Sequence, residues 1–174
     1  ERWLTQQPFA FVLSLVWPSS TPPQASNALW LVLSLLKPEL RLDQIFRVAR
    51  GHGPPQTGPG LGTNETTAQS EAAGSAVPEP YVFRGLICYS GMHYVALFWC
   101  WSRMKWVLFD DTCVTEELDW NSVVRFIMNS TYLPTLIFYE FMDHGGRKPP
   151  KASLEELRRQ MGDLEDMQNT CSAM

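Results

Sequence analysis

Two runs of strand-forming residues, separated by a short polar break, constrain the fold of this chain more than any other feature. Tyr94–Trp101 and Trp106–Phe109 are rich in aromatic and β-branched residues, which favour strands. Only Ser102–Lys105 lies between them, and a break this short permits a tight turn. The two runs are therefore predicted to form an antiparallel hairpin.

This hairpin predicts that His93 lies near two adjacent acids, Asp110 and Asp111. Counting outward from the turn brings the histidine within two or three residues of them across the hairpin. Opposed side chains of such a pair are about 5 Å apart at Cβ, within reach of a His–Asp hydrogen bond. A histidine acts as a general base near neutral pH when a carboxylate holds its ring and tautomer. The same spacing also fits an ordinary hairpin whose His and Asp merely stand at a strand end.

The remaining patterns predict an α+β fold, a mostly antiparallel sheet with a few packed helices. Strand character is found in Phe9–Trp17, Tyr81–Tyr89 and Leu133–Phe141, in addition to the hairpin. Helical spacing is found in Gln24–Leu36 and in Asp119–Met128, where Asp119 is a plausible cap. Leu42–Val48 indicates a short element, a turn followed by a strand.

Composition divides the chain into four parts. Residues 1–50 form a strand–helix part and residues 81–142 a sheet. Between them, residues 51–80 hold Gly, Pro, Ser and Thr with almost no large apolar side chain, which predicts a disordered insertion. Residues 143–174 are charged, with helical spacing over Leu154–Met161, and are expected to leave the domain as a tail that contacts a protein partner.

Charge and cysteine usage exclude several kinds of protein. The net charge of −4 argues against nucleic acid as a partner. The apolar runs are too short to cross a bilayer, and without a signal peptide an intracellular location is expected, in cytoplasm or nucleus or at cell junctions. No cofactor and no zinc site are expected, because none of the four cysteines forms a C-x-x-C pair. These are Cys88, Cys100, Cys113 and Cys171.

Three stretches carry a resemblance to a known family: Gly85–Tyr94, Lys105–Val114 and Tyr132–Tyr139. Together they resemble the histidine box of the ubiquitin-specific proteases, papain-like cysteine peptidases that hydrolyse the bond after the C-terminal glycine of ubiquitin. The resemblance covers about the middle third of the chain and extends more weakly to Phe9–Val48. It is closest to the branch long classed as inactive, since Met92 stands where most members have a glycine.

The resemblance implies a role for each candidate residue and a papain-like fold. His93 would be the general base, and Asp110 would orient it. Asp111 would be an alternate orienting acid or a polar support near the oxyanion. Gly91 would give the loop before His93 the freedom to approach the ubiquitin tail. Tyr94 would contact substrate or pack the hairpin.

The family's cysteine nucleophile stands in a Gly-Asn-Thr-Cys box before an apolar helix, and this chain has no such segment. Cys88 and Cys100 lie in apolar strands and are expected to be buried, reduced thiols. As possible nucleophiles, Cys88 and Cys113 are each expected to be a packed thiol or a loop residue instead. The chain is therefore predicted to be the C-terminal part of a deubiquitinase catalytic domain, inactive alone, with ubiquitin or a ubiquitinated protein as partner. Two alternatives are a pseudo-enzyme that binds ubiquitin or scaffolds partners, and a degenerate α+β domain that no longer folds alone.

Overall fold

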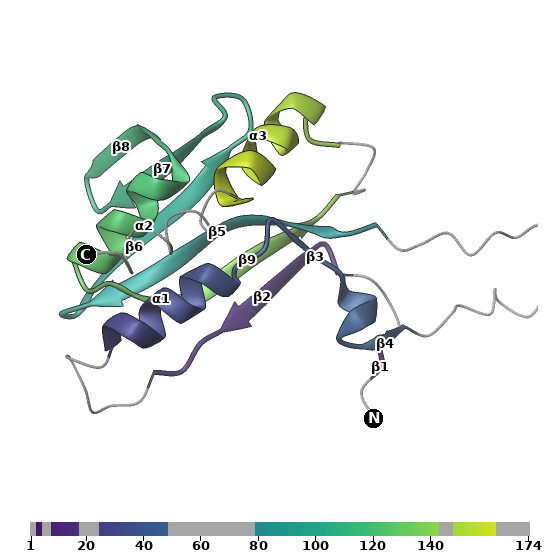
Figure 1. Cartoon of the computed structure of the whole chain (residues 1–174), viewed down its shortest axis with the longest axis horizontal. Coiled ribbons are helices and arrows are strands. Elements are labelled where there is room, and N and C mark those ends of the chain that lie inside the picture. The colour runs from purple at the N-terminus through teal and green to yellow at the C-terminus, as the bar shows by residue number, and fades with distance from the viewer. Residues whose placement is uncertain (1–2, 5–7, 18–24, 49–78, 143–147, 163–174) are drawn as a thin grey trace, which may run out of the picture.

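A computed structural model describes residues 3–4, 8–17, 25–48, 79–142 and 148–162. Within these ranges the chain forms a seven-stranded antiparallel sheet and three α-helices (Figure 1). The strands of the sheet are β2 (Ala10–Ser14), β3 (Glu39–Leu40), β5 (Tyr81–Ser90), β6 (His93–Cys100), β7 (Lys105–Asp110), β8 (Cys113–Leu118) and β9 (Leu133–Phe141). The helices are α1 (Ala25–Leu35), α2 (Trp120–Asn129) and α3 (Lys151–Gly162). A 3₁₀ turn, η1 (Leu42–Gln44), and a parallel pair of β1 (Trp3–Leu4) with β4 (Arg47–Val48) complete the described elements.

The strands follow the order β2-β9-β5-β6-β7-β8, and β3 pairs with β5 off this path. The prediction of an α+β fold with a mostly antiparallel sheet is confirmed. A papain-like arrangement of these elements stays a prediction. The insertion predicted at 51–80 lies outside the described residues except for Glu79 and Pro80, directly before β5.

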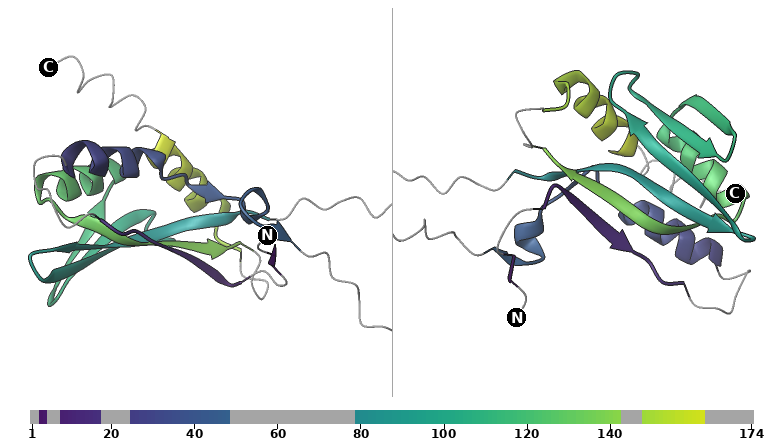
Figure 2. Two further views of the ribbon diagram at one scale, coloured as in Figure 1. Left: turned by 90° about the horizontal axis from the view of Figure 1, so that it is seen from below. Right: turned by 180° about the vertical axis from the view of Figure 1, so that it is seen from behind.

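All three α-helices cover the same face of the sheet, as the left view of Figure 2 shows. The core between the two layers contains Trp99, Trp106 and Trp120, each at most 1% exposed. The Trp106 ring lies 4.9 Å from the Trp120 ring and 5.6 Å from the Trp99 ring, between centroids. Aromatic side chains bury large areas, so this cluster forms a large apolar contact between β6, β7 and α2.

The predicted hairpin is present as β6 and β7. Its ladder runs from Cys100 opposite Lys105 to Ala96 opposite Phe109, and Trp101–Met104 forms the turn. The same register, continued outward, places His93 diagonally across from Asp110. Since side chains alternate along a strand, His93 lies on the helix-covered face together with Val95 and the other buried residues of β6.

The predicted helices are confirmed, and the observed first and last residues differ from the predicted ones by only one or two positions in most cases. The N-cap of α2 is Asp119, whose carboxylate accepts a 2.7 Å hydrogen bond from the Ser122 backbone N–H. This bond satisfies one of the amides left free at a helix start. None of the described helices is long and apolar enough to cross a membrane.

The expectation that residues 143–174 leave the domain is wrong for α3. Leu154, Leu157 and Met161 are 8%, 0% and 4% exposed and belong to the main core. Two polar contacts fix the position of the helix: the Ser153 hydroxyl accepts from Trp99 Nε1 at 3.3 Å, and Gln160 Oε1 accepts from the Trp120 backbone N–H at 3.1 Å. The reason is that α3 packs over Trp99 and Trp120, which it contacts through Ser153 and Gln160.

Candidate active site

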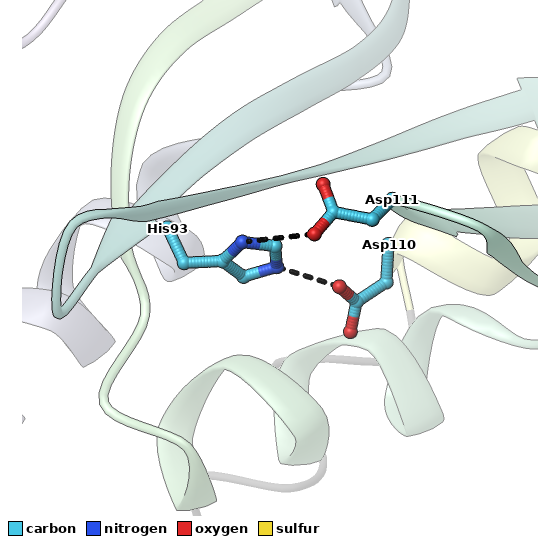
Figure 3. A group of neighbouring side chains, drawn as sticks. All are labelled: His93, Asp110 and Asp111. Atoms are coloured by element: carbon cyan, nitrogen blue, oxygen red, sulfur yellow. Dashed lines mark hydrogen bonds and ion pairs between the residues drawn. The ribbon is translucent and has the colours of Figure 1, made fainter.

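The candidate site is built where β6 begins and β7 ends. His93 is the first residue of β6 and Asp110 the last of β7, and the diagonal register brings their side chains together. His93 Nε2 lies 2.6 Å from Asp110 Oδ1 (Figure 3). The side chains are 32% and 40% exposed, so solvent and ligands reach both. A hydrogen bond this short to a carboxylate is charge-assisted and holds the ring firmly.

Asp111 approaches the other nitrogen of the same ring. Its Oδ2 lies 3.6 Å from His93 Nδ1, too far for a hydrogen bond, and its side chain is 77% exposed (Figure 3). Asp111 stands in the two-residue turn between β7 and β8 with a φ of +48°. That left-handed conformation is tolerated by aspartate better than by most residues. The turn thus directs two consecutive carboxylates at opposite edges of one imidazole.

The contact with Asp110 fixes the tautomer of His93. A carboxylate only accepts hydrogen bonds, so the short contact requires a proton on Nε2. In the neutral ring, Nδ1 then carries the lone pair. His93 therefore presents a free basic nitrogen on the edge that faces Asp111.

Gly91 and Tyr94 do not join this cluster. Gly91 and Met92 form the turn between β5 and β6, with φ of +57° and +68°, and Met92 is 90% exposed. Both positive angles are those of a type I′ turn, in which glycine is favoured. Tyr94 pairs with Tyr89 at a ring distance of 4.8 Å and lies on the sheet face opposite His93.

Two further residues lie near the histidine in the order of the sheet and are not among the candidate residues predicted above, although both belong to the stretches that resemble the histidine box. Ser90 is the direct partner of His93 in the β5–β6 ladder, and Tyr132 is one residue beyond the Tyr89–Leu133 pair on the other side of β5. Burial raises the pKa of Tyr132, and the charge of Asp110 raises it further. Its ring stacks on Phe126 of α2, 5.4 Å away. The available signal was its position directly before a strand that pairs with β5.

The cysteines near the site lack the features of an activated thiol. Cys88 is buried on β5, and burial raises its pKa well above the usual range. Cys113 is exposed and lies opposite Asp110 in the β7–β8 ladder. Cys100 stands at the end of β6 away from His93; it is half-buried and not fully buried as expected, and a hydrogen bond with the Ser102 hydroxyl lowers the pKa of its thiol. None of these three begins a helix, and Cys171 lies outside the described residues.

Fold and site together define an α+β domain with an oriented, solvent-accessible His–carboxylate group at one end of an antiparallel sheet. No model of a known protein family matches the chain. The chain is 39% identical to human ubiquitin carboxyl-terminal hydrolase 53 over 56 residues, which is 32% of this chain and 5% of that protein. It is 30% identical to ubiquitin carboxyl-terminal hydrolase 54 of Rattus norvegicus and of Mus musculus over 139 residues, which is 79% of this chain and 7% of each relative.

These matches show a distant homology to ubiquitin-specific proteases. The chain spans less than a tenth of the length of the curated relatives it matches.

Proposed function

We propose that this chain supplies the histidine–aspartate half of a thiol-dependent ubiquitin hydrolase site. His93 is the general base and Asp110 orients it, while Asp111 is a polar support near the oxyanion once it has moved aside from Nδ1. The nucleophilic cysteine comes from a part of the protein outside this chain. The homology to ubiquitin carboxyl-terminal hydrolases supports ubiquitin or a ubiquitinated protein as the partner.

The 2.6 Å contact between His93 Nε2 and Asp110 Oδ1 is the observation that carries the proposal, because a carboxylate acceptor there requires the ring proton on Nε2. Because Asp110 holds that proton, Nδ1 is free to accept the proton of an approaching thiol. The imidazolium that forms is stabilised by Asp110, as an acid stabilises the histidine of other nucleophilic sites. The same Nδ1 then returns the proton to the leaving lysine amine, and water later releases the acyl group. Proton transfer by a positioned side chain contributes about 10²–10⁴-fold to such a reaction.

One observation favours a second candidate, a ubiquitin-binding or scaffold module without turnover. The Asp111 carboxylate lies 3.6 Å from Nδ1, the nitrogen that a thiol would have to approach. A carboxylate at this position opposes the approach of a negatively charged thiolate. The two candidates therefore differ in whether Asp111 moves aside when the rest of the site is present.

Covalent capture of the full-length protein by ubiquitin with a C-terminal electrophile distinguishes the two. Capture that is lost in His93→Ala and retained in Cys113→Ser supports the proposed base and a nucleophile elsewhere. Capture retained in His93→Ala contradicts the role of His93. Absence of capture with ubiquitin binding intact supports the module. The isolated chain is expected to hydrolyse neither an ester nor an amide of ubiquitin, and turnover by it would refute the argument for an external nucleophile.

A further inference from the structure

The imidazole of His93 and the carboxylate of Asp111 offer two ligand atoms that could bind the same metal ion. His93, Asp110 and Asp111 each offer one ligand atom, and these atoms lie within 4.8 Å of one another. The two carboxylates are placed differently around the ring. Asp110 is hydrogen-bonded to Nε2 at 2.6 Å, whereas Asp111 stands 3.6 Å from Nδ1 without a hydrogen bond.

We infer that His93 Nδ1 and Asp111 bind a divalent first-row transition-metal ion such as Zn²⁺, with Asp110 as the supporting acceptor behind the ring. Zinc lies about 2.0–2.1 Å from a histidine nitrogen and about 2.0–2.2 Å from a carboxylate oxygen, so a tetrahedral angle holds the two atoms about 3.4 Å apart. The observed 3.6 Å needs only a small side-chain rotation to fit. The 2.6 Å between Nε2 and Asp110 is too short to admit an ion.

Asp110 completes a carboxylate–histidine–metal arrangement. Histidine ligands of metals usually donate their other ring N–H to a carboxylate, which fixes the tautomer and raises the basicity of the coordinating nitrogen. Here Nε2 is already hydrogen-bonded to Asp110, and Nδ1, which carries the lone pair, lies 3.6 Å from Asp111 Oδ2. An imidazole–carboxylate pair suits zinc, copper or nickel, whereas Mg²⁺ and Ca²⁺ prefer oxygen ligands alone. Water reaches the remaining positions, since Asp111 is mostly exposed.

The inference does not require a proteolytic role for these residues, although the ion would occupy the nitrogen that the proposed function uses as base. The experiment therefore measures metal binding by the 174-residue chain and not catalysis. Zn²⁺ is titrated into the reduced protein by calorimetry in the presence of excess Mg²⁺. We expect one site, weakened at least tenfold in His93→Ala and in Asp111→Asn. Asp110→Ala is expected to weaken binding by about 10–100-fold, as loss of a supporting acceptor does.

Two controls separate this site from other ligands. Cys113→Ser tests the exposed thiol beside Asp110, and Glu155→Gln tests loss of an exposed acid elsewhere. Both are expected to bind Zn²⁺ as the unmodified chain does. No binding, unchanged binding in His93→Ala, or loss of binding in Cys113→Ser would each overturn the inference.

A measurement on the unmodified chain protects the test from variants that fail to fold. In a ¹⁵N-labelled sample, Zn²⁺ should shift the Nδ1 resonance of His93 while its Nε2 keeps the proton. A shift at Nε2 instead, or at neither nitrogen, refutes the geometry. Because this readout follows a single ring, it is independent of the ubiquitin-capture result in either direction.

Discussion

Replacing Leu157 by alanine tests whether α3 belongs to the domain core. Leu157 is fully buried, and the substitution removes three carbon atoms. At about 0.8 kcal/mol per buried methylene group, the lost transfer free energy is about 2.4 kcal/mol. The cavity left behind adds to this, which gives a loss of about 3 kcal/mol in the free energy of unfolding, within the usual range for such changes. For a domain of this size the melting temperature should fall by roughly 10 °C.

Urea unfolding followed by tryptophan fluorescence measures the loss, because α3 contacts Trp99 through Ser153. Glu155→Ala is the matched control: it lies on the same helix but is exposed, and should change the free energy of unfolding by no more than about 0.5 kcal/mol. If the two variants unfold at the same urea concentration, α3 does not contribute to the core and the docking described above is wrong.

Two further predictions concern the turn before the site and the start of α2. Met92→Gly should raise the free energy of unfolding in urea by about 0.5–1 kcal/mol. Relief of the left-handed conformation of Met92 is worth about 1–2 kcal/mol, and the flexibility that glycine adds to the unfolded chain reduces this gain. No gain would show that the turn is unstrained. Asp119→Ala should cost about 1 kcal/mol at pH 7 through loss of the helix cap. Hydrogen bonding by Ser122 lowers the pKa of Asp119, so the charged cap stabilises above its ordinary pKa of about 3.9 and this contribution is lost as pH falls through the lower folded value. The stability difference between the protein and Asp119→Ala should therefore narrow below pH 4, and a constant difference would contradict the assigned cap.

The elements that sequence patterns predict well are those fixed by neighbouring residues. The β6–β7 hairpin follows from its short polar break, and α2 follows from its spacing and the Asp119 cap. The docking of α3 does not follow in this way. Its apolar positions Leu154, Leu157 and Met161 repeat at helical spacing, but nothing in them specifies that Trp99 and Trp120 are the surface they cover.

In the candidate site, too, the contacts fixed by neighbouring residues can be predicted from the sequence and the others cannot. The contact of His93 with Asp110 follows from counting outward from one turn, since no irregularity interrupts the β6–β7 ladder between Ala96 and Cys100. The position of Tyr132, one residue beyond the Tyr89–Leu133 pair, does not follow from counting, because the β5–β9 ladder shifts register between Ile87 and Cys88. A one-residue shift moves every later side chain to the other face, so counting fails beyond it.

Both proposed roles of the site depend on one proton. With that proton held on Nε2 by Asp110, Nδ1 has a lone pair for whatever lies beside it, whether a thiol proton or a metal ion. The two cannot be bound at once, because a nitrogen has a single lone pair to give. Asp111 then acts with opposite sign in the two cases: its charge favours a cation at Nδ1 and disfavours a thiolate there. A site that keeps both acids is thus better suited to a cation while it stands alone, and becomes suited to a thiol only if the rest of the protein draws Asp111 away from the ring.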